Sequence, residues 1–214
     1  MTKPDLYERI VRARDEYHSR RFDVEDLAPT WHEQFDLWFR AALDAGLPEP
    51  NGMVLATVGT DGAPSARTVL LRGLDERGLK FHTNRHSLKG RQLATNPQVA
   101  VVFPWVPIHR QIVVSGRVTL LSDAESDEYW ASRPIESRIS ALASPQSEVV
   151  PSRAALEQLR VRAAEGDLSR PVRWGGYLIT PTVVEFWQGR EHRFHDRLRY
   201  RQTESGWVTE RLAP

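Results

Sequence analysis

The chain has 214 residues, 40% of them hydrophobic and 27% charged, and its 29 Lys and Arg against 28 Asp and Glu leave a formal net charge of +1. This balance excludes the strong overall field that nonspecific nucleic-acid binding requires, and the lack of cysteine excludes disulfides, thiolate nucleophiles and thiolate metal sites. The longest apolar run, Val99–Ile108, contains two prolines and is far shorter than the roughly 20 residues that span a bilayer, so we expect a cytoplasmic protein that stays off membranes.

The N-terminal stretch differs in character from the rest of the chain. Asp5–Tyr17 has helical spacing but is short and heavily charged, and residues 20–29 show no regular pattern. A segment of this kind is marginal until it docks on something else. We therefore expect a mobile N-terminal segment at residues 1–29 and a single domain at residues 30–214.

The first element of the domain is a predicted helix. Thr30 and Glu33 have the spacing of a capping box, and the helix should run to about Ala45, where Gly46 ends it. Its inward face should carry Phe35, Leu37, Trp38 and Ala42.

From Met53 onward, alternating apolar residues and turn signals predict strands that are mostly linked by hairpins. Such links give an antiparallel sheet, which can close into a barrel, so the predicted class is mainly β with inserted helices (α+β). The expected strands are 53–58, 65–72, 79–83, 99–105, 111–121, 174–180, 183–188, 191–201 and 207–211, and the inserted helices are 87–95, 122–132, 135–143 and 152–164.

The stretch Glu185–Tyr200 carries four arginines and two histidines. If residues 191–201 form a strand, Arg193, His195 and Arg197 share one face, because side chains two apart point the same way. Guanidinium groups and an imidazole in one row suit a planar anionic ligand. The alternative is a solvated hairpin that happens to be basic.

Further polar clusters have the composition of phosphate sites. Arg67 and Arg72 flank an apolar strand, and Lys89 lies in the first turn of a helix that Ser87 can cap. Tyr129, Arg133 and Ser137 follow at spacings of four, which places them on one side of a helix. Surface arginines at strand ends and an ordinary helix–helix junction are the alternatives. Taken together, the clusters indicate two phosphate-sized sites.

Other common sites are absent from the sequence. Neither GxGxxG nor GxxxxGK[ST] occurs, which argues against the two common nucleotide-binding loops. The pair His192 and His195 lacks the glutamate of an HExxH zinc motif, so no metal site is expected.

These residues, taken in order, resemble the pyridoxine (pyridoxamine) 5′-phosphate oxidases, flavoproteins with an antiparallel FMN-binding split β-barrel. The likeness runs from about Arg14 to the C-terminus. It is carried by Arg67–Leu71, Asn96-Pro97, Phe103-Pro104-Trp105, Ser132-Arg133-Pro134, Gln146-Ser147, Trp174-Gly-Gly176, Glu185-Phe-Trp-Gln-Gly189, His192-Arg193-x-His195-Asp196-Arg197 and Arg211-Leu-Ala-Pro214.

The resemblance implies a role for each matching position. Arg193 and His195 would lie over the pyridine ring as the catalytic pair, and Arg14 and Tyr17 would close over the bound substrate. The substrate phosphate would be held by Arg72, Tyr129, Arg133 and Ser137. The cofactor FMN would be contacted by Arg67 with the backbone of Thr68, Val69, Leu70 and Leu71, and by His82, Thr83, Lys89, Gln111, Gln146, Ser147, Trp187 and Arg197.

The resemblance also implies a homodimer with FMN in a groove between the subunits, and a reaction. Hydride would pass from C4′ of pyridoxine or pyridoxamine 5′-phosphate to N5 of FMN, and O2 would reoxidise the flavin to give hydrogen peroxide and pyridoxal 5′-phosphate, with ammonia released from the amine. The alternatives are a related split-barrel oxidase of the phenazine-pathway type, a non-catalytic protein that binds FMN or pyridoxal phosphate, and a purely structural basic barrel.

Three positions depart from the family pattern. Arg72 stands where lysine is usual, His82 where tyrosine is usual, and Leu88 where arginine is usual. A charge-assisted hydrogen bond contributes about 1.5–3 kcal/mol. Because Leu88 cannot form one, we expect weaker FMN retention than in typical relatives.

Overall fold

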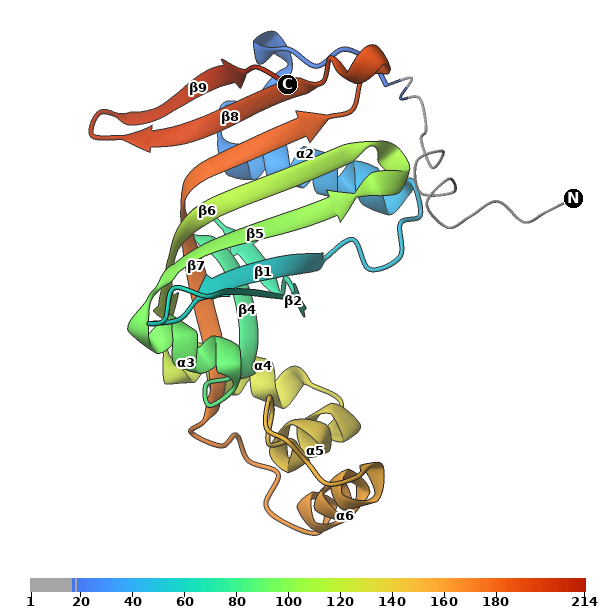
Figure 1. The fold of residues 1–214 in the computed structure, drawn as a ribbon, viewed down its shortest axis with the longest axis vertical. Helices are drawn as coiled ribbons and strands as arrows, with labels where there is room; N and C mark the ends of the chain where they lie inside the picture. The colour runs from blue at the N-terminus through green and yellow to red at the C-terminus, as the bar shows by residue number, and fades with distance from the viewer. Residues whose placement is uncertain (1–16, 18) are drawn as a thin grey trace, which may run out of the picture.

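The computed structural model describes residue 17 and residues 19–214. The helix predicted at Asp5–Tyr17 and the predicted substrate residue Arg14 lie outside this part of the chain, apart from Tyr17 itself. Within it, a curled antiparallel sheet of nine strands forms the body of the molecule, with helices α4, α5 and α6 gathered at one end (Figure 1). The predicted α+β class is confirmed.

The sheet follows the order β2-β1-β5-β6-β7-β4-β3, and β8 and β9 extend it from the far half of β7. β7 pairs with β6 along most of its length, with β4 over Trp174–Ile179 and with β8 over Val183–Gln188. The two edges of the sheet, β2 and β3, form no ladder with each other among the described residues, so the barrel stays split. The strands are β1 (Gly52–Val58), β2 (Pro64–Leu70), β3 (Gly73–Asp75), β4 (Gly78–Asn84), β5 (Gln98–Trp105), β6 (Arg110–Leu120), β7 (Trp174–Gln188), β8 (Asp196–Thr203) and β9 (Gly206–Leu212).

The helices begin where the sequence predicts them. Thr30 and Ser122 each form the expected capping box, with Glu33 and Glu125 respectively, and Ser87 accepts a hydrogen bond from Gly90 N–H. The helical segments are η1 (Val24–Asp26), α2 (Trp31–Asp44), α3 (Leu88–Thr95), η2 (Val106–Ile108), α4 (Asp123–Ser132), α5 (Ile135–Ala143), α6 (Arg153–Ala164) and η3 (Glu191–Arg193).

The main core lies between α2 and the curled sheet. Phe35 packs edge-on against Phe103 with ring centroids 5.1 Å apart, and Trp38 does the same with Phe186 at 5.2 Å. Burial of aromatic rings of this size supplies much of the driving force for folding. Leu37, expected to face inward, is 54% exposed, so that prediction is wrong.

β7 is one continuous strand where the sequence predicted two. Proline at position 181 and the polar Thr182 looked like a break, but the strand passes them through a bulge in which Gly116 pairs with Pro181 and Ser115 pairs with Val183. A bulge tolerates a proline because one residue leaves the hydrogen-bond ladder. The bulge also marks the place where β7 exchanges its neighbour β4 for β8.

The return strand predicted at residues 191–201 is also wrong in its first part. His192 and Arg193 have positive φ angles of 55° and 63°, which strand geometry does not allow, and β8 begins only at Asp196. The chain makes the 3-10 turn η3 instead. The expected single face of Arg193, His195 and Arg197 therefore does not exist, because the first two precede the strand.

No helix within the described residues is long and apolar enough to cross a membrane.

Candidate active site

The largest gathering of predicted site residues lines a cavity of about 620 Å³ where β2 and β4 meet α3, α4 and α5. It contains residues predicted to hold FMN together with all four predicted to hold the substrate phosphate. The lining residues are Thr68, Val69, Leu70, Arg72, His82, Thr83, Lys89, Tyr129, Ser132, Arg133, Pro134, Ser137 and Gln146.

The cavity is cationic. Arg72, Lys89 and Arg133 line it, and none of the described residues in its wall is acidic. Lys89 is only 7% exposed, yet its ammonium group donates to neutral oxygens alone, Gln146 Oε1 at 3.0 Å and Thr83 Oγ1 at 3.3 Å among them. Burial lowers the pKa of Lys89 to about 8, and the charge of Arg67 adds to the shift. A buried cation without an anion is costly, so the cavity fits a phosphate-bearing ligand such as FMN.

Arg67 lies beside this cavity and shows the same electrostatic situation. Its guanidinium donates to Leu55 O at 3.1 Å, Thr57 Oγ1 at 2.6 Å and Ser65 Oγ at 2.6 Å, all of them neutral. Burial lowers its pKa as well. These bonds hold the side chain in place, and they leave its charge uncompensated.

The predicted substrate-phosphate residues are brought together by the break between α4 and α5. Arg133 has extended backbone geometry and ends α4, and its Nη2 donates to Ser137 O at 2.8 Å. Tyr129, one turn earlier, faces the same cavity, and the guanidinium of Arg72 lies 6.0 Å from its ring centroid. The break at Arg133-Pro134, between α4 and α5, turns the side chains of Tyr129, Arg133 and Ser137 toward one space.

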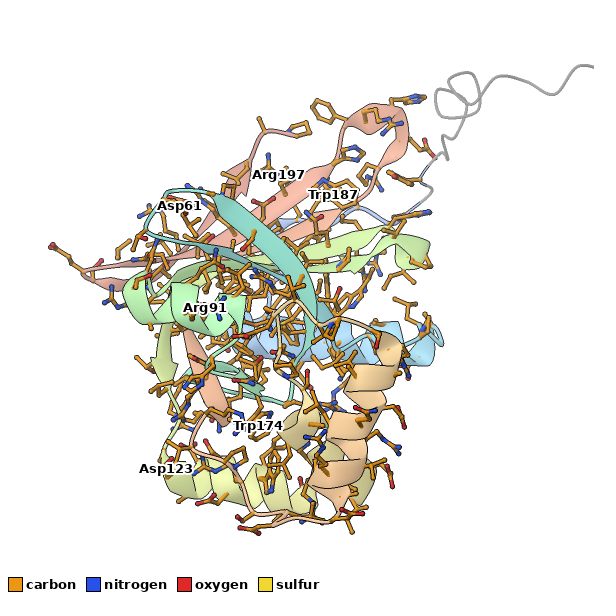
Figure 2. The ribbon with its side chains drawn as sticks, turned by 60° about the horizontal axis from the view of Figure 1, so that its bottom comes forward. Asp61, Arg91, Asp123, Trp174, Trp187 and Arg197 are labelled. Atoms are coloured by element: carbon orange, nitrogen blue, oxygen red, sulfur yellow. The ribbon has the colours of Figure 1, made fainter. Side chains whose placement is uncertain are left out.

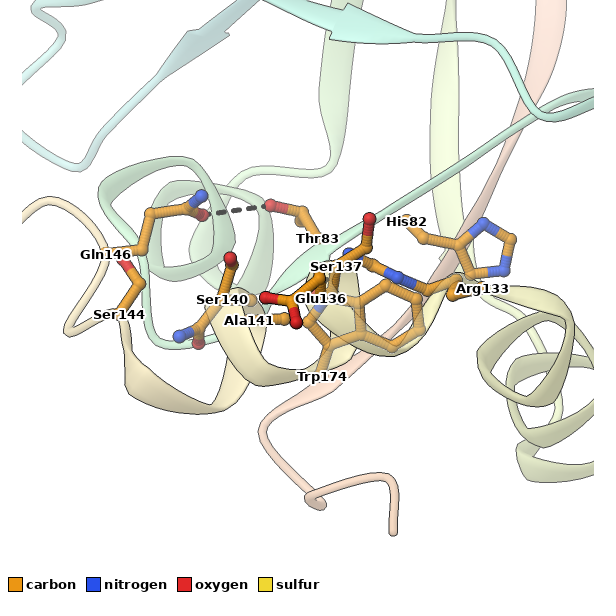
Figure 3. Close-up of a pocket in the computed structure, with 11 residues that line it drawn as sticks. His82, Thr83, Arg133, Glu136, Ser137, Ser140, Ala141, Ser144, Gln146 and Trp174 are labelled. Carbon is orange, nitrogen blue, oxygen red and sulfur yellow. Dashed lines mark hydrogen bonds between the residues drawn. The ribbon is translucent and has the colours of Figure 1, made fainter. Parts of the chain in front are cut away.

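A second cavity, of about 570 Å³, shares part of this wall (Figure 3). His82, Thr83, Arg133, Ser137 and Gln146 line both spaces. The Thr83 hydroxyl donates to Gln146 Oε1 at 3.2 Å and so links β4 to the loop after α5. Side chains that face two adjoining cavities can contact two ligand groups at once.

The other predicted residues lie at the opposite end of β7. Gln111, Trp187 and Arg197 are cross-strand neighbours on β6, β7 and β8, so they form one row on one face of the sheet. Arg197 is paired there, because its guanidinium donates to both carboxylate oxygens of Glu185, at 2.7 and 3.0 Å.

His195 and Tyr17 belong to this second cluster. The ring centroid of His195 is 4.7 Å from that of Trp187 and 5.8 Å from that of Tyr17. His195 Nδ1 accepts a hydrogen bond from Arg190 N–H at 3.0 Å. Burial and the neighbouring Arg193 lower its pKa, so the ring is neutral and carries its proton on Nε2. Arg193 itself is exposed.

The two clusters are far apart in one chain. Trp174, against the second cavity, is the first residue of β7, and Trp187 is the next-to-last. A strand advances about 3.3 Å per residue, and Figure 2 shows the two side chains well apart, Trp187 in the upper and Trp174 in the lower half of the view. Two predicted residues join neither cluster. Leu71, predicted to contact FMN through its backbone, donates its N–H to Asn51 O at 2.8 Å, and Ser147 is exposed, with a φ of 75°.

Eight lining residues of the two cavities were not predicted as site residues: Asn84, Ser132, Pro134, Glu136, Ser140, Ala141, Ser144 and Trp174. Ser132 and Pro134 flank Arg133, and only the bend between the helices brings them to the wall. Trp174 lines the second cavity, and its ring lies 4.7 Å below the Arg133 guanidinium. The motif Trp174-Gly-Gly176 was a signal for this residue, but without the fold it indicated no role. Within residues 17 and 19–214, no group of three or more His, Asp or Glu could hold a metal ion.

Two family models match the chain. Residues 39–165 match the model described as pyridoxamine 5′-phosphate oxidase, and residues 174–214 match the one described as pyridoxine 5′-phosphate oxidase C-terminal dimerisation region. Among curated proteins, the pyridoxine/pyridoxamine 5′-phosphate oxidase of Burkholderia mallei (strain SAVP1) is 51% identical over 212 residues, which cover 96% of this chain and 99% of that protein. The protein of the same description from Burkholderia cenocepacia (strain HI2424) is 51% identical over 211 residues, covering 96% and 99% of the two chains.

Solved structures show the same fold. PhzG from Burkholderia lata 383, in complex with tetrahydrophenazine-1-carboxylic acid, superposes with a TM-score of 0.87 at 30% identity and covers 94% of this chain and 100% of its own. A pyridoxamine 5′-phosphate oxidase-related, FMN binding protein from Nostoc punctiforme superposes with a TM-score of 0.71 at 23% identity, over 88% and 98% of the two chains. The matches to family models and curated relatives, which together span nearly the whole sequence, show that the chain belongs to the pyridoxamine 5′-phosphate oxidase family.

Proposed function

We propose that the protein is an FMN-dependent oxidase that converts pyridoxine 5′-phosphate or pyridoxamine 5′-phosphate to pyridoxal 5′-phosphate. O2 is the acceptor, and the products are hydrogen peroxide and, from the amine, ammonia. The observation that carries this proposal is the composition of the 620 Å³ cavity. It combines one group of residues for a flavin phosphate with a second group for a substrate phosphate, and no carboxylate among the described lining residues neutralises either.

At the flavin end, Lys89 and Arg67 supply charge, and Thr83 and Gln146 supply neutral hydrogen-bonding atoms. The uncompensated charge of the buried Lys89 is the reason that a phosphate monoester suits this place. When bound, FMN supplies the two-electron redox chemistry that no side chain of the protein can perform.

At the substrate end, Arg72, Tyr129, Arg133 and Ser137 bind and orient the phosphate. Arg133 is held between the Trp174 ring and Ser137 O before any ligand arrives. A donor that is fixed in advance loses little conformational freedom on binding, and this improves both affinity and orientation. The phosphate thereby anchors the substrate at one point, and its ring is positioned by other residues.

His195 and Arg193 orient and polarise the pyridine ring. Because Nδ1 of His195 accepts from Arg190 N–H, the neutral ring presents Nε2–H, which is a donor. A ring in this tautomer donates a hydrogen bond to the substrate through Nε2 and does not remove a proton there. Arg193 adds positive charge close to the same ring.

The active enzyme is a homodimer in which the cavity of one subunit faces the Trp187 cluster of the other. Two observations support this arrangement. The cavity and the Trp187 cluster are at opposite ends of β7 in a single chain, and the model described as a dimerisation region covers residues 174–214, which include that cluster. A two-fold axis repeats each half-site, so one dimer forms two complete sites.

The likeness to PhzG supports a second candidate, an oxidase that acts on a phenazine precursor. The two functions differ in the anion that the substrate end must bind. Four donors, two of them guanidinium groups, match a phosphate dianion with three acceptor oxygens better than a carboxylate with two. The vitamer phosphates are therefore the favoured substrates.

The test is peroxide formation by the FMN-loaded protein with pyridoxine 5′-phosphate and with unphosphorylated pyridoxine. We expect the phosphorylated compound to be oxidised with a kcat/KM at least a hundredfold higher. Arg133→Ala should remove about 1.5–3 kcal/mol of binding, or 10- to 150-fold in kcat/KM. The exposed Arg117→Ala, on β6 and outside the cavity, is the matched control and should change neither value. Equal rates with both compounds would refute a phosphate-directed function.

A further inference from the structure

His82, predicted to contact FMN, occupies an unusual position in the cavity wall. It lies on β4, and its ring is nearly parallel to that of Tyr129, with centroids 4.0 Å apart and an interplanar angle of 22°. The Trp174 ring, on the adjacent strand β7, is 5.4 Å from His82 at 16°. Tyr129 lies 6.0 Å from Trp174 at 7°, so the three rings are nearly parallel and Tyr129 lies closest to His82.

His82 and Trp174 therefore form an aromatic floor on the sheet, and α4 and the bend after it place two phosphate-binding side chains on that floor. Tyr129 rests on His82, and the Arg133 guanidinium is 4.7 Å from the Trp174 ring centroid. Figure 3 shows His82, Arg133 and Trp174 side by side at the cavity. Stacked rings and a cation over an indole both attract, so these contacts hold Tyr129 and Arg133 in place.

The ring nitrogens of His82 make no hydrogen bond with the described residues around this floor. Both Nδ1 and Nε2 are buried, and neither has a hydrogen-bond partner anywhere in the part of the chain that the structure describes. Burial, with the charges of Arg133 and Arg72, lowers the pKa of His82 to about 4. The imidazole is therefore neutral near pH 7, and what it offers to its neighbours is a flat surface.

Gly176 makes room for this flat ring. It is the cross-strand partner of His82, and a Cβ atom there would come within 2.8 Å of His82 Nε2 and 2.5 Å of Leu121 Cδ1. Such contacts are too close for carbon, so any side chain at position 176 would tilt the ring of His82 and with it the surface under Tyr129. The glycine in the Trp174-Gly-Gly176 motif has a geometric purpose here.

We propose that His82 is a positioning residue for the substrate phosphate: its ring, lying flat over Gly176, holds Tyr129 in the geometry that binds the phosphate. This inference rests on the proposed function and reassigns His82 from the flavin to the substrate. It requires that loss of the ring weakens phosphate binding and leaves FMN binding unchanged. A residue that only stabilised the fold would affect both ligands.

The experiment measures two affinities for the wild type, His82→Ala, His82→Phe and the matched control His86→Ala, an exposed histidine of the following loop. FMN binding is followed by flavin fluorescence, and pyridoxine 5′-phosphate binding to the FMN-loaded protein by calorimetry without O2, with inorganic phosphate as a second probe. We expect His82→Ala to weaken both phosphate ligands about tenfold, which corresponds to the stacking contribution, and to change FMN affinity less than about twofold. His82→Phe restores a flat ring without nitrogens and should rescue the loss.

Gly176→Ala provides an independent arm. Alone it should weaken phosphate binding as His82→Ala does, because its new methyl group displaces the ring. In the His82→Ala background, Gly176→Ala should reduce the affinity for the phosphate ligands much less, because the ring that it would displace is gone. Additive effects of the two substitutions would overturn the proposal, as would an unchanged phosphate affinity in His82→Ala or an equal loss of FMN.

The outcomes separate this inference from the proposed function. A wild-type protein that binds pyridoxine 5′-phosphate but forms no peroxide overturns the oxidase assignment, and the positioning role of His82 is then still decided by the binding data. A wild-type protein that binds neither phosphate ligand overturns both.

Discussion

Trp174 and Trp187 stand near the two ends of the single strand β7, yet each belongs to a different half of the candidate active site. Trp174 lies under Arg133 beside the cationic cavity, and Trp187 lies beside His195. One rigid strand cannot bring its two ends together. The strand therefore fixes the spacing between the half-sites, and in the proposed homodimer a second copy of the chain completes each of them.

This arrangement predicts complementation between inactive variants. Arg133→Ala should damage the cavity and Arg193→Ala the other half-site, and each homodimer should be nearly inactive. When the two are co-expressed, a heterodimer has one site with both defects and one with neither. Random pairing should therefore restore about a quarter of the wild-type activity per dimer.

The activity of the co-expressed pair, measured as peroxide formation against each variant alone, is the readout. As a control, Arg133→Ala with Arg72→Ala removes a guanidinium from the same half-site in both chains, so no site is intact and nothing should be restored. Activity no higher than that control would show that each site is built within one subunit.

The sequence predicted the parts of the fold that depend on local chemistry. The capping boxes at Thr30 and Ser122 place two helix starts correctly, because a cap and its partner are close in the chain. The joining of two strands into β7 was missed, because the bulge opposite Ser115 and Gly116 depends on pairing with a distant strand. Hydrophobic alternation carries no information about such pairing.

The sequence was enough to group many residues of the candidate site, but it did not predict their backbone conformation or the strand pairing that places them. Tyr129, Arg133 and Ser137 could be grouped from their spacing, and they do line one cavity. The positive φ angles of His192 and Arg193 could not be foreseen, since histidine adopts such angles only occasionally and arginine rarely, and no glycine stands at either position. The role of Trp174 needed the β4–β7 pairing, which places its ring beside His82.

The lowered pKa of Lys89 predicts that FMN affinity decreases at alkaline pH. This pKa is lowered to about 8 in the free protein, and a bound phosphate dianion would raise it again. Above pH 8 the protein must therefore take up a proton to bind FMN, and affinity should fall by up to about tenfold per pH unit. Between pH 6.5 and 7.5 it should be nearly constant, because phosphate monoesters have their second pKa near about 6.

Flavin fluorescence titrations from pH 6.5 to 9.5 measure this dependence. Lys89→Arg keeps its charge over the whole range and should bind without the decline, and Lys89→Met should bind weakly at every pH. A wild-type affinity that does not change through pH 9, or a decline that persists in Lys89→Met, would assign the effect to another group.

Because Leu88 cannot donate a hydrogen bond to FMN, we expect weak FMN retention, and a cationic side chain at this position should increase FMN affinity. Leu88 is the first residue of α3, next to Lys89, and its side chain is 42% exposed, so a longer cation fits there. Leu88→Arg should tighten FMN binding by roughly 10- to 150-fold if a charge-assisted bond forms. Leu88→Gln, which is polar and uncharged, is the control. Dialysis followed by the flavin absorbance that remains provides the measurement, and equal retention by wild type and Leu88→Arg would contradict the prediction.

Arg193 should act on turnover and not on the flavin. It is exposed and beside His195, and it is predicted to contact the substrate ring and not FMN. Arg193→Ala should lower kcat/KM by two or more orders of magnitude, as loss of a charged contact to the reacting ring does, with FMN affinity within about threefold of wild type. Arg193→Lys should recover part of the rate. If Arg193→Ala lowered FMN affinity and kcat/KM by the same factor, Arg193 would not be a substrate-contacting residue.

The central claim, that the cavity brings a phosphorylated vitamer to the flavin for oxidation, is tested most directly by anaerobic bleaching. FMN-loaded protein is mixed without O2 with pyridoxine 5′-phosphate, pyridoxamine 5′-phosphate or unphosphorylated pyridoxine, and the flavin absorbance is followed in time. If the protein is this oxidase, the oxidised-flavin band should disappear rapidly with a phosphorylated vitamer, and one pyridoxal 5′-phosphate should form for each flavin reduced. With pyridoxine the band should change little. An oxidised flavin that persists with both phosphorylated vitamers would contradict this claim.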